Sequence, residues 1–380
     1  MDIELTPELA AMRTALRRFT DRELEPWART VDERGELPEE VSALLSRNGY
    51  LGLRLPAAYG GADIGLFAYC LTLEEFSRSH RIFTTVVGAS SGLAPTAIAR
   101  HGTPAQRDRY LPGLVTGKLR TAFALTEPDA GSDSAAMKTR ATRADGGWVL
   151  DGRKHYISGA HVADFVMVMA VTDPEKRARG GISAFIVDRG TPGFAVTRVD
   201  TTIGSDAIKL AELTFENCRI PDSALLGEAG KGFRYAMESL TEGRLSVACS
   251  CLGAADKLLE MSVAHAKTRH TFGKPLAERQ AIQWMLADSA VELAAARALT
   301  YETLRQVEAG RDVGSAPSMS KLVCSETVGR IADRAVQVQG WMGLIEGFPV
   351  ERFYRDVRHY RVGEGSSEMQ RMLISRELLR

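Results

Sequence analysis

The stretch Ala211-Glu212-Leu213-Thr214-Phe215-Glu216 alternates strictly between apolar and polar residues. A period of two is typical of a β-strand with one buried face and one wet face. The stretch lies near the end of a region, from about residue 121 to 220, that reads as strands throughout. Apolar, β-branched runs occur at 165–171 and 182–187, and the turn signals Asp145-Gly146-Gly147 and Asp151-Gly152 flank a short run at 148–150.

Both flanks of this region have helical patterns. Thr6-Pro7 is a helix start signal, and the apolar stripe after it consists of Leu9, Met12, Leu16 and Phe19. Further N-terminal helices are expected at 38–46, 67–80 and 104–111, with Pro112-Gly113 stopping the last one.

Helical texture resumes near residue 232, after the loop 227–232. Small residues crowd 247–255, which favours close helix packing. Long helices are expected up to about residue 339, and a final one at 367–379. One core stripe is predicted from Ile282, Leu286, Ala290 and Leu293.

The order helices, strands, helices predicts an α+β protein that is mainly α. We expect an N-terminal α-helical domain at 1–120, a middle β domain at 121–226 and a C-terminal helical bundle at 227–380. A βαβ alternation is absent, which argues against a doubly wound fold.

Composition narrows the class of protein. The 380 residues carry 48 basic and 48 acidic side chains, so neither nucleic acid nor an anionic membrane is indicated as a partner. The acidic start Met1-Asp2-Ile3-Glu4 predicts no signal peptide, and no apolar run is expected to reach the ~18 residues of a membrane span. The five cysteines fit no CxxC pattern, so we expect reduced, mostly buried thiols in a cytoplasmic protein.

Motifs for nucleotide loops and metals are missing. The sequence has no GxGxxG after a strand, no phosphate loop and no HExxH, so no metal site is expected. One hydrolase signal occurs, Gly88-Ala89-Ser90-Ser91-Gly92, which matches G-x-S-x-G. A nucleophile elbow needs a strand before it, and the surrounding pattern is helical, so a Ser90 esterase is the disfavoured alternative.

Other motifs each allow two interpretations. The loop 126–133 follows the apolar run 122–125 and either presents polar groups to a ligand or is a capped turn. Tyr156 and Ser158 project from the same strand face and could cover a planar ligand, or the tyrosine could be buried in the β domain.

Two further segments are charged. The segment 268–275 could grip a pyrophosphate through an exposed Arg–Phe pair, but ordinary helix C-cap chemistry is favoured when it is considered alone. The segment 354–361 mixes acidic and basic residues, which favours a salt-bridged helix face.

Glu364 lies between two glycines in the run Val362-Gly363-Glu364-Gly365-Ser366-Ser367-Glu368. Backbone and ligand can both approach a carboxylate in that setting. It suits a general base whose pKa is raised by excluding water.

Taken in order, these segments resemble the acyl-CoA dehydrogenase family of flavoproteins over nearly the whole chain. The matching pieces are Leu55-Pro-x-x-Tyr-Gly-Gly61, Leu125-Thr-Glu-Pro-x-Ala-Gly-Ser-Asp133, Lys154-x-Tyr-Ile-Ser158, Arg269-x-Thr-Phe-Gly273, Gln337-Val-Gln-Gly340 and Tyr354-Arg-Asp…Glu364-Gly-Ser-Ser-Glu368. The resemblance implies an N-terminal helical domain, a middle β-barrel domain and a C-terminal four-helix bundle.

The resemblance also implies FAD and the α,β-dehydrogenation of an acyl thioester to the 2-enoyl thioester. Glu364 matches the family's base, which removes the α-proton while the β-hydride passes to flavin N5, and its backbone N–H helps bind the thioester oxygen. Side chains at Gly363 and Gly365 would crowd this approach. Some members carry the base at the position of Gly243, which cannot serve as a base here.

Further site residues follow from the same resemblance. Arg244 and Gly365 match substrate contacts, and Ser132 matches a contact to both FAD and CoA. The other residues that match FAD contacts are Phe123, Leu125, Thr126, Tyr156, Ser158, Arg269, Thr271, Phe272, Gln280, Gln337, Gly340, Ser366 and Glu368.

The implied partners are an acyl-CoA or carrier-protein thioester, an acceptor of the electron-transfer flavoprotein type, and further copies of the chain. The ADP half of FAD would bind across a dimer interface, in a dimer or a tetramer. An oxidase or flavin monooxygenase on the same fold is the alternative. The small, polar segment 84–95 would line the acyl pocket, and it indicates either a wide or polar pocket or simple helix packing.

Overall fold

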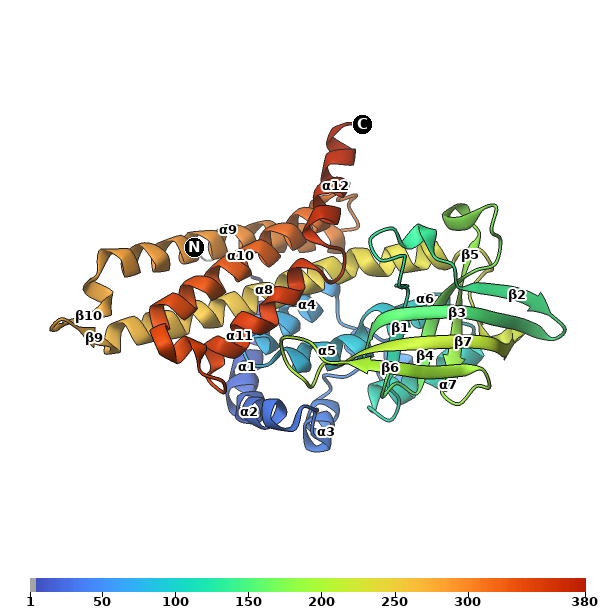
Figure 1. Cartoon of the computed structure of the whole chain (residues 1–380), viewed down its shortest axis with the longest axis horizontal. Helices are drawn as coiled ribbons and strands as arrows, with labels where there is room; N and C mark the ends of the chain where they lie inside the picture. Colours follow the sequence, from blue (N-terminus) through green and yellow to red (C-terminus); the bar gives the residue numbers. More distant parts are fainter. Residues whose placement is uncertain (1–4) are drawn as a thin grey trace.

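The computed structural model describes residues 5–380, so residues 1–4, on which the absence of a signal peptide was predicted, lie outside it. Most N-terminal helices and a long helical bundle lie at one end of the molecule, and the strands lie at the other end, where the last two N-terminal helices pack against them (Figure 1). The predicted fold class, mainly helical with a strand-rich middle region, is confirmed.

The N-terminal helices begin where the sequence supplies caps. The Thr6 hydroxyl accepts from the N–H of Leu9 at the start of the first helix, and Thr103 forms a capping box with Gln106 at the start of the last. The helices are α1 (Pro7–Phe19), α2 (Glu25–Arg34), α3 (Glu39–Arg47), α4 (Leu66–Phe76), α5 (Arg81–Ser91), α6 (Leu93–His101) and α7 (Pro104–Val115).

The prediction that Pro112-Gly113 stops a helix is wrong, because α7 continues to Val115. Proline removes only one donor near the helix end, and the Thr116 hydroxyl donates to the Pro112 carbonyl. A Cβ at Gly113 would lie 2.5 Å from Leu119, so this glycine permits close packing rather than ending the helix.

The middle domain contains an eight-stranded mixed sheet with the pairing order β6-β7-β3-β2-β4-β5-β8, and β1 pairs parallel to β4. Ala211, Leu213 and Phe215 of β7 are buried in alternation, as the sequence pattern predicts. The strands are β1 (Thr121–Ala124), β2 (Arg140–Ala144), β3 (Gly147–Ser158), β4 (Phe165–Val171), β5 (Ile182–Asp188), β6 (Phe194–Asp200), β7 (Leu210–Pro221) and β8 (Leu225–Leu226).

Of the two predicted turns here, only Asp145-Gly146-Gly147 is one; it joins β2 to β3. Asp151-Gly152 instead lies inside β3, where the register with β7 shifts at a bulge. Gly152 has φ +149°, and a Cβ there would lie 2.5 Å from the Thr139 hydroxyl oxygen. Glycine at position 152 therefore allows both the bulge in β3 and the close approach of β3 to Thr139.

The C-terminal part is built on the long helix α8 (Gly232–Thr268), which packs along α4 and α10. The predicted close packing at 247–255 is confirmed, since a Cβ at Gly253 would lie only 1.7 Å from the Glu74 carbonyl oxygen of α4. The other elements are the hairpin β9 (His270–Thr271) and β10 (Lys274–Pro275), α9 (Gln280–Glu308), α10 (Ala316–Gln339), α11 (Pro349–Val357) and α12 (Ser367–Leu378).

The core stripe predicted on α9 is only partly correct. Leu293 is buried, but Ile282 and Leu286 are half-buried and Ala290 is exposed. Ser289 and Ala296 are buried instead. A single sequence cannot distinguish a helix face that packs inside the subunit from an apolar face that is left exposed on it.

Segment 81–101 corrects the expectation about apolar runs. By length and composition alone, Arg81–His101 could cross a membrane, with a mean hydropathy of 1.4. However, more than half of its most apolar stretch of residues is buried inside the protein, and Gly92 divides the segment into α5 and α6. A buried core segment of a folded protein accounts for this composition.

Candidate active site

Glu364 lies in the turn between residues 358–361 and α12, with φ +55°. Gly365 follows with φ +88°, and a Cβ there would lie 2.7 Å from Nε2 of Gln370, so glycine is required. Gly363 has no positive φ, and a Cβ there would make only ordinary contacts with His359. Within the subunit, the crowding expected at both glycines is thus found only at Gly365.

Glu364 is half-buried, and one oxygen of its carboxylate is enclosed by protein. Its Oε2 is inaccessible to solvent and has no hydrogen-bond partner. Burial raises the pKa of Glu364, and the positive charges of Arg244 and Lys321 oppose that shift. A carboxylate with a raised pKa and a free oxygen is suited to accept a proton.

Two side chains hold the turn that carries Glu364. Nζ of Lys321, on α10, donates to the Gly365 carbonyl at 2.7 Å, and Nε2 of Gln370, on α12, donates to the same oxygen at 2.9 Å. Burial lowers the pKa of Lys321, whose side chain is completely buried. Neither residue was predicted from the sequence. The signal available for Lys321 was a lysine in a segment of α10 whose neighbouring residues are small or apolar.

The two possible base positions converge in space. A Cβ at Gly243, on α8, would lie 2.9 Å from Oε2 of Glu364 and 3.3 Å from Cδ2 of Leu93. Arg244 follows directly, its Nε buried without a partner, and burial lowers its pKa. In the part of the chain that the structure describes, the backbone N–H of Glu364 also has no acceptor.

A second group of predicted residues gathers in the middle domain. Phe123 lies on β1, and Leu125 and Thr126 follow it directly. The Thr126 carbonyl accepts from the N–H of His155 at 2.9 Å, which joins this loop to β3. The exposed Ser132 lies further along the same loop.

A buried ion pair between Lys154 and Glu127 holds this loop. Nζ of Lys154 donates to Oε1 of Glu127 at 2.8 Å and to the Leu125 carbonyl at 3.0 Å. Glu127 also accepts from the backbone N–H groups of Lys138 and Thr139. The loop is therefore held in one conformation; Lys154 and Glu127 lie inside the recognised motifs, but their pairing is not evident from the sequence.

Tyr156 is exposed, so the alternative of a buried tyrosine is wrong. It has φ +58° at a second bulge in β3, and its ring stacks on His155 at 3.9 Å. Ser158 is also exposed, whereas Ile157 between them is buried. Both side chains are thus accessible, while the bulge at Tyr156 interrupts the simple alternation from which a shared strand face was predicted.

Sequence models for three domains cover nearly the whole chain: the acyl-CoA dehydrogenase N-terminal domain matches residues 6–118, the middle domain 122–218 and the C-terminal domain 230–379. The chain belongs to the acyl-CoA dehydrogenase family. It is an FAD-dependent oxidoreductase that acts on acyl thioesters.

Similar proteins include both dehydrogenases and reductases. The chain is 37% identical to an acryloyl-CoA reductase (NADH) from Anaerotignum propionicum, over 100% of this chain and 96% of that protein. It is 37% identical to the caffeyl-CoA reductase-Etf complex subunit CarC from Acetobacterium woodii, over 92% of each. The structure of butyryl-CoA dehydrogenase from Megasphaera elsdenii superposes with a TM-score of 0.94 at 34% identity, covering 100% of both chains.

The residues of the middle domain fit a flavin of this family. Tyr156 offers an exposed ring against a planar ligand, and Thr126, Ser132 and Ser158 offer hydroxyl groups for its polar edge, whereas Leu125 is buried. A Cβ at Gly131 would meet nothing within 4 Å, so the loop is open to a ligand there. Ser366 caps α12, and Glu368 lies in its first turn, next to the turn that carries Glu364.

The residues that match contacts to the ADP half lie elsewhere. They occupy the far tip of the bundle: Arg269 at the end of α8, Thr271 and Phe272 in the hairpin, Gln280 at the start of α9, and Gln337 and Gly340 at the end of α10 (Figure 1). Phe272 is 98% exposed. The helix C-cap favoured for 268–275 is wrong, since Phe272 and Gly273 form the turn of the hairpin β9–β10.

The Ser90 esterase is excluded by geometry. Ser90 lies near the end of the helix α5, not on a strand-to-helix elbow, and is buried. Its hydroxyl donates to the Val87 carbonyl at 3.0 Å.

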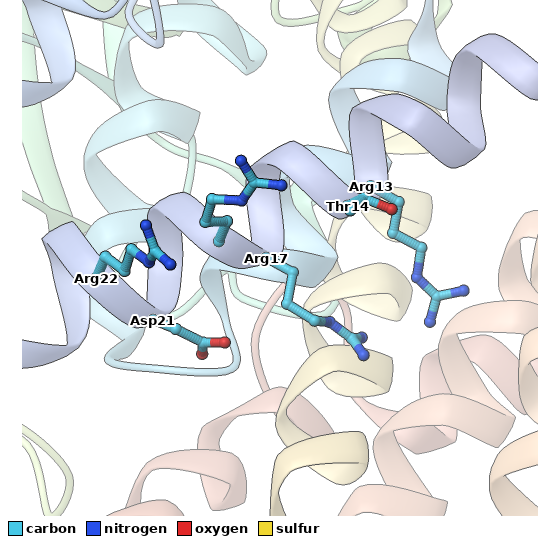
Figure 2. Close-up of a pocket in the computed structure, with 6 residues that line it drawn as sticks. Arg13, Thr14, Arg17, Asp21 and Arg22 are labelled. Atoms are coloured by element: carbon cyan, nitrogen blue, oxygen red, sulfur yellow. The ribbon is translucent and has the colours of Figure 1, made fainter.

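Other features carry no catalytic chemistry. A surface cleft of about 410 Å³ lies along α1 and the helical turn 20–24 that follows it (Figure 2). It is lined by Arg13, Thr14, Arg17, Arg18, Asp21 and Arg22, but Arg13 and Arg17 are engaged with Glu75. Among residues 5–380, no cluster of His, Cys, Asp and Glu could hold a metal ion, and all five cysteines are free and buried. The predicted salt-bridged helix face at 354–361 is confirmed in part: Arg355 pairs with Glu351 one turn earlier on α11, whereas Arg361 pairs with Glu326 of α10.

Proposed function

We propose that Glu364 is the base that removes the α-proton of an acyl-CoA, giving the 2-enoyl-CoA. The observation that carries the proposal is the enclosed Oε2 of Glu364, which has no partner and belongs to a carboxyl with a raised pKa. A structural carboxylate in such a place would normally be paired. An unpaired one, held by a fixed turn, is available to a substrate.

The chain's own residues supply the rest of the proton transfer. The α C–H bond breaks toward the Glu364 carboxylate, while the unpaired N–H of Glu364 stabilises the negative charge that develops on the thioester oxygen. Arg244 and Lys321 stabilise the ionised carboxylate before the reaction. FAD, when bound, supplies the acceptor for the hydride that leaves the β-carbon.

The sign of the pH dependence follows from the raised pKa. Glu364 must be ionised to accept the proton, so activity falls as pH decreases through its pKa. Because burial raises that pKa, the loss begins at a higher pH than for an exposed glutamate.

We further propose that the FAD site is shared between subunits of a homo-oligomer. The helix α8 has 37 residues, or about 55 Å, and separates the middle domain from the tip that carries Arg269 and Phe272. An extended FAD molecule is much shorter than that separation. Only a second subunit can therefore bring its bundle tip to the flavin loop, and the exposed Trp284, Val291 and Trp341 are apolar surface for such contacts.

The physiological partners form the remainder of the proposal. Electrons pass to an acceptor of the electron-transfer flavoprotein type, which agrees with the name of the Acetobacterium relative. The thioester is carried by CoA, and the enzyme works in the cytoplasm. A reductase reduces the 2-enoyl double bond that a dehydrogenase forms, and some relatives are named as reductases. The direction of the reaction in the cell therefore depends on the electron partner.

Glu364→Gln tests the base. The variant should keep FAD and bind acyl-CoA, but the rate of anaerobic flavin bleaching should fall by about 10²- to 10⁴-fold. Glu40→Gln, at an exposed position on α3, is the matched control and should bleach normally. Flavin bleaching in Glu364→Gln at the wild-type rate would refute the proposal. In the wild type, reoxidation of the reduced flavin by oxygen as fast as by an electron-transfer protein would instead indicate an oxidase.

A further inference from the structure

The inference concerns the glycines of α5 and the hydroxyl group behind them. Gly88 and Gly92 lie on a half-buried face of this helix. The Tyr69 hydroxyl oxygen lies 3.8 Å from the position that a Cβ would take at Gly88 and 3.5 Å from that position at Gly92. Because both residues are glycine, no side chain of theirs covers the hydroxyl.

Leu93 connects the surroundings of this hydroxyl with those of the Glu364 carboxylate. It follows Gly92 in the chain, and its Cδ2 lies 3.3 Å from the Cβ position of Gly243, which is itself 2.9 Å from Oε2 of Glu364. An acyl chain whose α-carbon lies at Glu364 and which extends past Leu93 would bring a distal carbon to Tyr69.

The Tyr69 oxygen is free to accept a hydrogen bond. The Ser246 hydroxyl donates to the Glu242 carbonyl at 3.2 Å, so its proton is not available to Tyr69. A phenolic oxygen is an acceptor as well as a donor, and a hydroxyl group on a ligand can supply the donor.

The charged side chains near Tyr69 are paired with one another. The Arg54 guanidinium lies 5.7 Å from the centre of the Tyr69 ring, but it is already bound to Glu242 at 2.7 Å. Glu242 is shared with Arg100, also at 2.7 Å. Arg54 is therefore engaged before a ligand binds, and the group that Tyr69 itself offers is a neutral hydroxyl.

A purely structural role explains less. Arg54 and Glu242 are 11% and 19% exposed, and a mostly buried ion pair is seldom more stabilising than apolar residues of similar size. The pair does fix the polar surroundings of Tyr69, where an alkyl pocket would be lined by apolar groups.

We propose that Tyr69 determines specificity by accepting a hydrogen bond from a neutral hydroxyl group on a distal carbon of the acyl chain. The substrate class is thus a hydroxylated acyl or aryl-acyl thioester. Arg54 and Glu242 are positioning residues, and Gly88 and Gly92 give access. The inference rests on the proposed function, since it takes the α-carbon to lie at Glu364.

The test compares matched thioesters that differ by one hydroxyl group. The probes are 3-(4-hydroxyphenyl)propanoyl-CoA against 3-phenylpropanoyl-CoA, and 6-hydroxyhexanoyl-CoA against hexanoyl-CoA. Dissociation constants are measured by calorimetry on FAD-loaded Glu364→Gln, which prevents turnover. The hydroxylated member of at least one pair should bind roughly 2- to 10-fold more tightly, the range for one hydrogen bond.

Two variants in that background assign the preference to Tyr69. Tyr69→Phe should abolish it without weakening the unsubstituted thioester. Gly88→Ala, which keeps the hydroxyl but places a methyl group in front of it, should abolish it as well. FAD content and circular dichroism show that each variant is folded, and Gly88→Ala provides the test if Tyr69→Phe does not fold.

The outcomes separate the two proposals. Equal affinities within both pairs, tighter binding of glutaryl-CoA than of the hydroxylated probes, or a preference that survives in both variants would overturn the role of Tyr69. Those results leave the proposed function intact if acyl-CoAs still bleach the wild-type flavin. If none of the thioesters binds or bleaches, the proposed function fails together with this inference.

Discussion

Replacing Lys154 by methionine removes the cation that holds the flavin loop. The Lys154 side chain has no exposed surface, and that of Glu127 is 5% exposed. The ammonium group donates to Glu127 and to the Leu125 carbonyl. In Lys154→Met the carboxylate would stay buried with only the backbone N–H groups of Lys138 and Thr139 as donors.

The magnitude follows from burial. Removing one member of a buried ion pair costs about 3 to 5 kcal/mol of unfolding free energy, because the remaining charge is uncompensated. Glu127→Gln should cost less, about 1 to 3 kcal/mol. The lysine can lose its proton in that variant, since burial already lowers its pKa to about 8. Lys154→Met removes the cation that lowers the pKa of Glu127, while burial continues to raise it, so the buried carboxyl group loses its main compensation.

Urea unfolding followed by circular dichroism measures the cost, and flavin fluorescence measures FAD release. Lys154→Met should unfold at lower urea than Glu127→Gln, and both should release FAD more readily than the wild type. Lys138→Met, which removes an exposed cation from the same segment, is the control and should stay close to the wild type. The reasoning is refuted if Lys154→Met matches the wild type in stability, or if Glu127→Gln is the less stable variant.

Three other outcomes are expected. Lys321 lowers the pKa of Glu364, so Lys321→Met should move the acid limb of the kcat/KM profile to higher pH; an unmoved limb would show that this charge does not act on the base. Gly253→Ala should destabilise the protein by about 1 to 3 kcal/mol in thermal unfolding, because its Cβ would collide with α4. Gly329→Ala is the control, since the nearest neighbour of its Cβ would lie at 3.9 Å, and it should leave the stability unchanged. Equal effects of the two substitutions would contradict the close packing of α8 on α4. Ser90→Ala should keep full dehydrogenase activity. Labelling of the wild type at Ser90 by a fluorophosphonate would instead support the esterase hypothesis.

Much of the architecture could be predicted from local patterns. The alternation at 211–216 predicts a half-buried strand because side chains of a strand point to opposite faces, and β7 has that burial. The Thr6-Pro7 start signal works because a hydroxyl group and a proline satisfy the first helical turn without distant partners. Glu364 was recognisable because its glycines and the ordered motifs around it are local features of the chain.

The errors share a physical cause. Pro112-Gly113 and Asp151-Gly152 contain the residues that usually break elements, but here the glycines permit close approach to Leu119 and Thr139. Ala290 has an apolar side chain, yet it lies on the exposed face of α9. A sequence records that a residue is small or apolar, and not which neighbour it will meet.

The sequence by itself determined the order of the domains, the family and the identity of the carboxylate, because each depends on residues close together in the chain. Only the tertiary structure decided what surrounds that carboxylate. Lys321 comes from α10, Gly243 from α8 and Leu93 from α6, and folding brings them to one point around Glu364. The pKa of Glu364 depends on the water they exclude and the charges they place there, and neither is defined until distant segments pack together.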